Sequence, residues 1–459
     1  MLFTRRPKAA LRLLAVLAAG LTTLSLSACG SKGSSSAGGS SGSATSGTVN
    51  WWGWSPTDTA TANGYIAAFN KKYPDIKVNY KLVSIADWQA ALTPALSSSS
   101  GPDVFDMQPG AYVTKYKSFA EDLTPVMAKA LGDDWKSKVL PAGISGLTAD
   151  GKLVGLNVGA TYAGILWINQ PLFDKYQLKP PTTLDEWINV CKVFASHKQG
   201  CFVQGAAGEG FDQDTLQAIA DSVEPGLWAR ASQGQAKWND PGIVKTLDIW
   251  HRLFTGGIMQ PGAIGYQQYP DANNDFLTGK YAMVMMGTWY TQYATKTAMT
   301  AALASAGVSG AKPFPIVPVQ FPDVAQAGHP SQLFGDADFG LSVAKKSKNR
   351  AAAETFAGWI AASTEGQQTI ADQLNNIQAL KGVQPNFDKV TFVDPELQAA
   401  PVKALLDKVS TVTEHRFALL NQDLQDAILQ AATSTASGKA TPQQAADALQ
   451  AAAVEAAQN

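Results

Sequence analysis

Histidine and cysteine are scarce in this chain, whose 459 residues include four histidines and three cysteines. No histidine and no second cysteine pair stands at the spacing of a metal site, so neither a metal nor a cofactor is expected. The sequence also contains no HExxH motif, no GxSxG nucleophile elbow and no phosphate-binding P-loop. No catalytic residue is therefore predicted, although two carboxylates paired only in space, as in glycoside hydrolases, would leave no such motif.

Beyond residue 28 the chain has no apolar run long enough for a membrane span, which needs about 20 residues. The earlier run Leu13–Leu26 follows four basic residues and no acid, which is typical of a secretory signal. It ends in Leu26-Ser27-Ala28-Cys29, and small residues before a cysteine at this point resemble a bacterial lipobox. We therefore expect a lipoprotein signal peptide over residues 1–28 and a palmitate-containing lipid on Cys29. The alternative is ordinary signal cleavage beside an incidental cysteine.

Charge is sparse in the segment that follows the signal. Residues 31–48 are mostly Ser, Gly, Ala and Thr with one charged side chain, Lys32. Such a segment cannot bury enough apolar surface to fold. We expect residues 29–48 to be a flexible tether, with the folded protein held on the extracytoplasmic face of the cell membrane by its lipid alone.

A strongly basic composition is missing as well. The signal holds four of the 36 basic residues and none of the 37 acidic ones, so the remainder is mildly acidic. The short basic cluster at 345–348 suits a solvated helix start, and nucleic acid is not an expected partner. The chain is too long for one comfortable core, so at least two domains are expected.

The two cysteines that remain, Cys191 and Cys201, lie close together in the segment CKVFASHKQGC. In an oxidising compartment such a pair can form a disulfide, which we expect here. Two free buried thiols are the alternative.

Strand and helix patterns alternate through the first part of the folded chain. They predict strands at Val49–Trp52, Ile76–Tyr80 and Val104–Met107, with helices at Thr57–Tyr73 and Asp87–Leu96. Such alternation indicates an α/β fold with a largely parallel sheet, in which ligands bind beyond the carboxyl ends of the strands. The loops Trp54–Asp58 and Asp106–Gly110 should therefore lie at the same rim.

The later part of the chain carries fewer strand signals. Thr183 with Glu186 predicts a capping box at the start of a helix. Residues 205–280 are expected to be mostly helical, followed by a dense apolar strand that ends at Gly287, just before Trp289. The tail from Leu405 onward is expected to be helical.

Several stretches occur in the order seen in one known family. They are Tyr65–Tyr80, Gly101–Met107, Gly151–Tyr176 with Pro180–Trp187, Phe276–Trp289 and Gly340–Gln367. Together with the lipobox, they resemble the extracellular solute-binding proteins of bacterial ABC importers. The resemblance is to the carbohydrate-uptake branch that includes maltose-binding protein.

The resemblance implies two discontinuous α/β lobes joined by a hinge, with a ligand cleft between them. We expect lobe 1 to comprise residues 49–156 and 328–362, and lobe 2 to comprise residues 160–322 and 367–459. The chain should cross between lobes near Gly155–Gly159, Pro322–Gly328 and Ser363–Gly366. The implied function is that of a monomer, not an enzyme, which captures a mono- or oligosaccharide and delivers it to the permease of an ABC importer.

The resemblance also implies where the ligand is contacted. The predicted ligand-binding residues are Trp52, Trp54, Asp58, Asp106, Gln108, Tyr162, Glu209, Phe211, Trp289, Asp336 and Asp338. Aromatic rings suit the C–H faces of a sugar, and carboxylates and amides suit its hydroxyl groups. Packing in the core is the alternative for each aromatic residue, and we favour it for Trp51 and Trp167.

Other functions remain open at this point. A polyol, glycerol phosphate or polyamine could occupy the same fold, and a surface glycoside hydrolase is a further alternative. A phosphate would require Arg or Lys at the rim, and the predicted loops contain none. A polyamine would require several acids beside aromatic rings, which the predicted site offers. This sequence departs from maltose-binding protein in most of the predicted contacts, so the resemblance implies a sugar without indicating which one.

Overall fold

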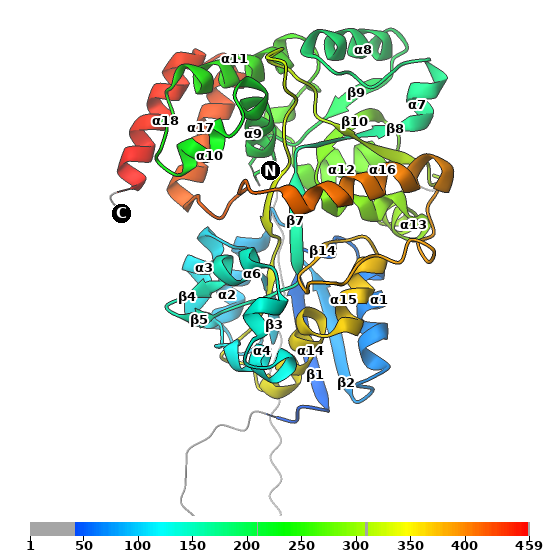
Figure 1. Cartoon of the computed structure of the whole chain (residues 1–459), viewed down its shortest axis with the longest axis vertical. Coiled ribbons are helices and arrows are strands. Elements are labelled where there is room, and N and C mark those ends of the chain that lie inside the picture. The colour runs from blue at the N-terminus through cyan, green and yellow to red at the C-terminus, as the bar shows by residue number, and fades with distance from the viewer. Residues whose placement is uncertain (1–41, 209, 308–310, 458–459) are drawn as a thin grey trace, which may run out of the picture. The chain divides into compact units, whose positions relative to one another are not determined.

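The computed structural model describes residues 42–208, 210–307 and 311–457. Its first sheet has five strands in the order β2-β1-β3-β13-β6. They are β1 (Gly47–Gly53), β2 (Ile76–Leu82), β3 (Val104–Met107), β6 (Leu156–Asn157) and β13 (Gly340–Val343). The first three run parallel, while β13 pairs antiparallel with both β3 and β6 (Figure 1). β1 begins two residues inside the segment expected to be the tether, because its backbone pairs with β2 from Gly47 onward.

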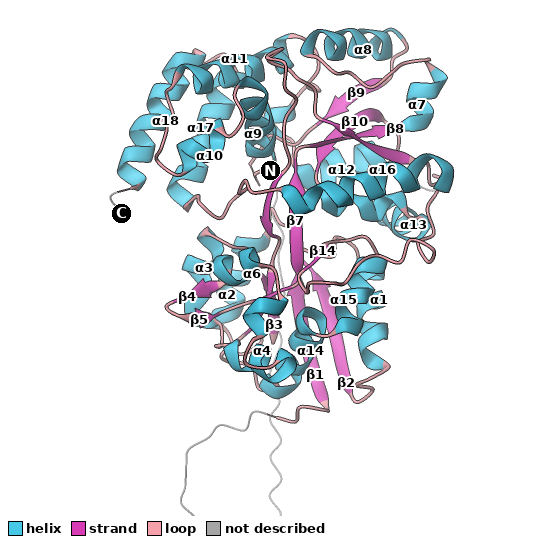
Figure 2. Ribbon diagram, in the orientation of Figure 1, coloured by secondary structure: helices cyan, strands magenta, loops and turns pink. Residues whose placement is uncertain are grey.

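Helices surround this sheet and close the first core (Figure 2). They are α1 (Thr59–Asn70), α2 (Trp88–Ser97), α3 (Ala111–Tyr116), η1 (Lys117–Phe119), α4 (Thr124–Leu131), α5 (Trp135–Lys138), α6 (Pro141–Gly146), α14 (Arg350–Ala362) and α15 (Thr364–Asp372). A short hairpin, β4 (Thr148–Ala149) and β5 (Lys152–Leu153), lies beside them. The helix expected from Thr57 begins at Thr59, because the Asp58 carboxylate caps it by accepting a hydrogen bond from the Thr61 backbone N–H at 2.8 Å.

A second, four-stranded sheet has the order β11-β8-β10-β9. Its strands are β8 (Ile165–Asn169), β9 (Gly200–Val203), β10 (Tyr281–Met286) and β11 (Ile316–Gln320). β10 is parallel to β9 and antiparallel to β8, and β8 is also antiparallel to β11. β10 is the apolar strand expected to end at Gly287, and five of its six residues are buried.

The helices of this second part include a group in which α11 contacts α9, α17 and α18, and α17 contacts α9 and α18. The helical elements are α7 (Gln170–Lys175), α8 (Leu184–Ser196), α9 (Phe211–Val223), α10 (Leu227–Ser232), α11 (Pro241–Thr255), η2 (Ala263–Gly265), η3 (Gln268–Ala272), α12 (Asn273–Leu277), η4 (Thr288–Ala294), α13 (Lys296–Ser305), α16 (Pro395–Lys408), η5 (Val409–Thr411), α17 (Gln422–Ala436) and α18 (Pro442–Ala456). Thr183 caps α8 as expected, but the Glu186 carboxylate accepts from Thr182 rather than Thr183, so the reciprocal bond of a capping box is shifted by one residue.

The two largest apolar clusters among the described residues, one in each lobe, confirm the two-lobe α/β architecture. We call the first-lobe cluster the first core and the second-lobe cluster the second core. The chain passes between them along a three-stranded sheet of β7 (Gly159–Ala163), β12 (Phe334–Ala337) and β14 (Ile377–Gln378). β12 and β14 both pair antiparallel with β7. Figure 1 shows β7 between the two larger sheets.

The second and third crossings lie later in the chain than the sequence suggested. Phe334 packs in the second core and Phe339 in the first, so the second crossing follows β12 rather than Pro322–Gly328. Ile370 and Val383 still pack in the first core, so α15 belongs there, although residues from 367 onward were assigned to lobe 2. The Gln367 amide explains this placement, because it donates to the Val158 carbonyl at 2.9 Å and accepts from the Leu380 N–H at 3.1 Å.

The structure joins Cys191 in α8 to Cys201 in β9 by a disulfide, which confirms the expected bridge. Both cysteines are buried against the second core. Replacing both with Ser should lower the free energy of unfolding by about 3 kcal/mol, because the unfolded chain regains the freedom that a closed short loop removes. Urea unfolding of the two proteins checks this, with non-reducing peptide mass spectrometry confirming the bridge in the parent. An unchanged unfolding midpoint would contradict it.

Within the described residues, no helix combines the length and the apolar character that crossing a membrane requires.

Candidate functional site

A cavity of about 420 Å³ lies between the two lobes, within the size range of sites for small ligands. The first lobe lines it with residues that end or follow its parallel strands, or that precede β13 and β14. These are Trp54, Ser55, Thr57, Leu82, Ser84, Ile85, Gln108, Asp338 and Asn375. The second lobe contributes Phe211, Tyr269, Pro270, Asn273, Asn274, Trp289, Gln292, Ser305, Arg416 and Phe417. The carboxyl edge of the first sheet thus forms one wall, as the alternation of strands and helices predicted.

Three aromatic side chains of the second lobe form the apolar part of the opposite wall. The Phe211 ring lies 5.8 Å from the Tyr269 ring and 6.3 Å from the Trp289 ring, between centroids. Trp289 donates a hydrogen bond from Nε1 to the Tyr269 hydroxyl at 3.2 Å. Its ring lies against Gly287, where a Cβ atom would come within 2.0 Å of it, so the glycine at the end of β10 makes room for this ring.

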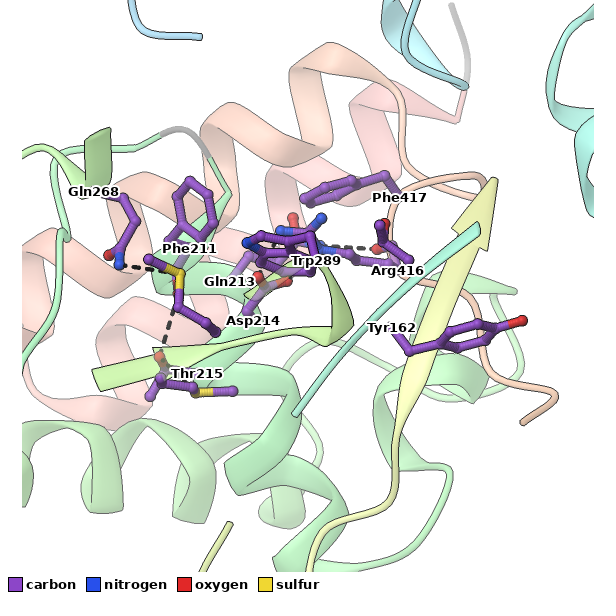
Figure 3. Close-up of polar contacts among 12 residues, drawn as sticks. Tyr162, Phe211, Gln213, Asp214, Thr215, Gln268, Trp289, Arg416 and Phe417 are labelled. Carbon is purple, nitrogen blue, oxygen red and sulfur yellow. Dashed lines mark hydrogen bonds and ion pairs between the residues drawn. The ribbon is translucent and has the colours of Figure 1, made fainter. Parts of the chain in front are cut away.

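Arg416 lies at the centre of this wall and was not predicted from the sequence. Its Nε and Nη2 atoms donate to the two Asp214 carboxylate oxygens at 2.7 and 2.6 Å (Figure 3). The guanidinium carbon is 4.7 Å from the Trp289 ring centroid and 4.2 Å from that of Phe417. Both members of the ion pair are buried, with 8% and 3% of their side-chain surfaces exposed. Nη1 of Arg416 has no partner among the described residues and can donate to a ligand.

Asp336 holds the backbone that carries Arg416. Its carboxylate accepts hydrogen bonds from the backbone N–H groups of Arg416, Phe417 and Ala418 at 2.8–2.9 Å. It also lies 2.5 Å from Nδ1 of His415, and this hydrogen bond raises the pKa of the His415 imidazole. Asp336 does not line the 420 Å³ cavity, so its place in the structure is that of a positioning residue.

Asp106 holds a backbone loop in the first lobe, as Asp336 does in the second. It accepts from Nε1 of Trp51 at 2.9 Å and from the backbone N–H groups of Trp54 and Ser55 at 3.0 and 3.2 Å. The carboxyl is completely buried, and burial raises its pKa well above the usual range. This carboxyl fixes the loop after β1 but does not line the cavity. Asp58, which caps α1, does not line it either.

Asp338 is the predicted acid that does line the cavity. It accepts from the Thr161 hydroxyl at 3.1 Å and from the Asn376 amide at 3.2 Å. Burial raises the pKa of this carboxyl, and the two hydrogen bonds and the nearby Arg416 charge oppose the rise.

The structure therefore brings together Trp54, Gln108, Phe211, Trp289 and Asp338 of the predicted ligand-binding residues. Trp54 is 8% exposed and also packs edge-on against Trp88, so it belongs to both the first core and the cavity wall.

Other predicted residues lie elsewhere. The Lys81 ammonium lies 3.5 Å from the centroid of the Trp52 ring, and Trp52 does not line the 420 Å³ cavity. Tyr162 points away from the Trp289–Arg416 group (Figure 3) and lines a different cavity beside β14. Trp51 and Trp167 are buried, in agreement with the core packing that the sequence analysis favoured for them. Glu209 and Cys29 lie outside the described residues.

Sequence reasoning missed several polar residues of the cavity besides Arg416. They are Ser55, Thr57, Ser84, Asn273, Asn274, Gln292, Ser305 and Asn375. Thr57 also shares a hydrogen bond of 2.6 Å with the Tyr293 hydroxyl, which links the two lobes. Half of these residues, Asn273, Asn274, Gln292 and Ser305, come from helical elements of the second lobe, where the sequence gives no strand end to mark a rim.

Comparison with known families identifies the chain. Residues 53–368, more than half of it, match the family described as bacterial extracellular solute-binding protein. The chain belongs to this family. The resemblance noted in the sequence is thereby confirmed, and members of the family are binding proteins that act outside the cytoplasm.

Relatives of this solute-binding protein support the same placement. It is 24% identical over 246 residues to an uncharacterized ABC transporter extracellular-binding protein of Pyrococcus horikoshii, covering 52% of this chain and 56% of the relative. It is 28% identical over 281 residues to the galactooligosaccharide-binding protein of Bacillus subtilis, covering 58% and 61%. The chain thus spans less than two thirds of the length of these relatives.

A solved structure from work on xylan utilization by the thermophilic bacterium Caldanaerobius polysaccharolyticus shares the fold with a TM-score of 0.69. The two chains are 22% identical, and the similarity covers 88% of this chain and 99% of the other.

Proposed function

We propose that this protein captures a neutral carbohydrate in the cavity between its lobes and delivers it to the permease of an ABC importer, without catalysing a reaction. The observation that carries the proposal is the pairing of an aromatic wall, Phe211 and Trp289, with polar groups that are almost all uncharged. The name of the Bacillus subtilis relative, a galactooligosaccharide-binding protein, supports a sugar as the ligand.

The chemistry of the walls suits a sugar ring. The C–H face of a pyranose is apolar and gains by leaving water for the Trp289 ring, while its hydroxyl groups need donors and acceptors. Asp338 can accept from a hydroxyl, Nη1 of Arg416 can donate, and the half-buried amide of Gln108 can do both.

The charged residues of the cavity argue against a polyamine, a phosphate and glycoside hydrolysis. Asp338 is the only carboxylate among the described lining residues, and Arg416 lies close enough to lower its pKa, so a polyamine finds little to bind. The Arg416 charge is matched by Asp214 in a bidentate pair, so it offers little to a phosphate. A glycoside hydrolase requires two carboxylates on either side of the scissile bond, and the described part of the lining supplies one.

Thermal unfolding of the purified protein with a panel of neutral sugars tests the proposal. A sugar present at 100 times its dissociation constant should stabilise the protein by about 2.7 kcal/mol, which raises the melting temperature by several degrees. Stabilisation by spermidine or glycerol phosphate, with no response to any sugar, would overturn the proposal. Release of shorter products from an oligosaccharide would overturn the non-catalytic part.

We also propose that the lipid on Cys29 holds the protein at the membrane. In the producing bacterium, Cys29→Ala should move the protein from the membrane fraction into the medium, because residues 29–48 offer no other anchor. Fractionation in high salt, followed by immunoblotting, measures this. A variant that remains with the membranes under these conditions would contradict the lipobox interpretation.

A further inference from the structure

The short helix η4 of the second lobe contacts the strand between the lobes, the ligand cavity and the first lobe. At its start, the Thr288 hydroxyl accepts from the backbone N–H of Tyr162 in β7 at 3.0 Å. The next residue, Trp289, lines the 420 Å³ cavity. Near its end, the Tyr293 hydroxyl shares a hydrogen bond of 2.6 Å with the hydroxyl of Thr57 in the first lobe. One element therefore joins the aromatic wall of the cavity to a contact between the lobes.

The loop that carries Thr57 is fixed by the first lobe itself. The Asp106 carboxylate accepts from two backbone N–H groups of this loop. The Tyr80 hydroxyl donates to the carbonyl of the preceding residue, Pro56, at 2.7 Å, and the carboxylate of the following residue, Asp58, caps α1. The backbone of Thr57 is thus held in place independently of the second lobe.

Tyr293 is held equally firmly on the other side. Its side chain is buried, and its ring packs edge-on against the Tyr290 ring with 4.8 Å between centroids. Tyr293 does not line the cavity, whereas Thr57 does. Because both partners are fixed before they meet, their hydrogen bond costs little conformational entropy to form.

The helices on either side of this hydrogen bond also meet. α1 begins shortly after Thr57 and α13 begins shortly after Tyr293, and the two helices contact each other. Any separation of the lobes at this rim breaks the hydrogen bond between the two hydroxyls. A ligand that contacts both walls of the cavity is released faster once the walls separate, so this bond opposes its release.

We infer that the hydroxyl pair of Thr57 and Tyr293 is a latch between the lobes, which slows the release of the bound sugar. Tyr293 is then a positioning residue, since it acts on a ligand that it does not touch. This inference rests on the proposed function and adds the residues that set the lifetime of the complex.

The test is stopped-flow measurement of sugar release, followed by the tryptophan fluorescence of the purified protein, with the sugar of the panel that binds best. Tyr293→Phe should speed release about fivefold, the factor that one hydrogen bond of ordinary strength gives, with little change in the association rate. Thr57→Ser keeps the hydroxyl and should release the sugar at the parental rate. Thr57→Val combined with Tyr293→Phe should release it no faster than the faster single variant, because the two residues share one interaction.

The first lobe contains a matched control. The hydroxyls of Thr93 and Tyr116 share a hydrogen bond of 3.0 Å between α2 and α3, and Tyr116 is as deeply buried as Tyr293. Tyr116→Phe removes the same group from the same kind of pair inside one lobe, so the release rate should not change. A purely structural role of the Tyr293 hydroxyl would lower the melting temperature of Tyr293→Phe without speeding release.

The outcomes separate the two claims. If a sugar binds and Tyr293→Phe releases it at the parental rate, the inference fails and the proposed function stands. The same holds if the effects of Thr57→Val and Tyr293→Phe multiply in the double variant, because the two hydroxyls then act separately. If spermidine or glycerol phosphate binds and no sugar does, the proposed function fails, and faster release of that compound from Tyr293→Phe would still support the latch. If no compound binds, both claims fail.

Discussion

Replacing Arg416 with Met should lower the free energy of unfolding by about 3–5 kcal/mol, because it leaves the Asp214 carboxylate buried without a counter-charge. Asp214 is 3% exposed at its side chain, and its two oxygens accept from Arg416. Ligand affinity should fall as well, since the guanidinium supports both the Trp289 and the Phe417 rings. Urea unfolding and calorimetric titration measure the two effects separately.

Two further variants decide what causes the loss. Adding Asp214→Asn to Arg416→Met removes the unpaired charge, so most of the stability should return while the affinity stays low. Arg230→Met breaks the ion pair of Arg230 with Glu224, which is exposed at both side chains, and should cost less than about 1 kcal/mol. A double variant no more stable than Arg416→Met would show that lost packing, rather than an unpaired charge, causes the effect.

Much of the first lobe could be predicted from the sequence, because its information is local. Alternating apolar residues indicated β1, β2 and β3. Because parallel strands place their carboxyl ends at one edge of the sheet, the loop with Trp54 and the residue Gln108 were expected at the same edge, and both line the cavity there. The same reasoning could not separate Trp52 from Trp54. Trp52 lies beside the Lys81 side chain from the neighbouring strand, a contact that depends on the pairing of β1 with β2.

The acids show a different limit. Asp58, Asp106 and Asp336 sit in the loops predicted to meet the ligand, yet each accepts hydrogen bonds from the chain itself. A loop at a rim needs buried acceptors to fix its backbone, and the sequence does not distinguish such a carboxylate from one that faces a ligand. Arg416 and Phe417 could not be predicted, because they follow η5 in an irregular segment with no strand or helix signal. Their position at the cavity depends on hydrogen bonds and an ion pair with Asp336 and Asp214, which are far away in the sequence.

The aromatic wall leads to the last prediction, which concerns Trp289. Its ring lines the cavity on one side and contacts Arg416 on the other, so Trp289→Ala should weaken sugar binding more than it destabilises the fold. Loss of about 100 Å² of apolar contact with a sugar ring, at roughly 25 cal/mol per Å², corresponds to about 2.5 kcal/mol, or a seventyfold weaker affinity. Calorimetric titration with the best sugar of the panel measures this loss.

Denaturation of the same variant provides the second readout. A fully buried tryptophan would cost about 3–5 kcal/mol of stability on truncation, and Trp289, which is only half-buried, should cost less. Trp52→Ala is the matched control, since Trp52 is also half-buried but lies outside the cavity, and its affinity for the sugar should equal that of the parent. A large loss of stability at unchanged affinity would assign Trp289 to the core. A loss of affinity in Trp52→Ala would instead restore the contact that the sequence predicted for that residue.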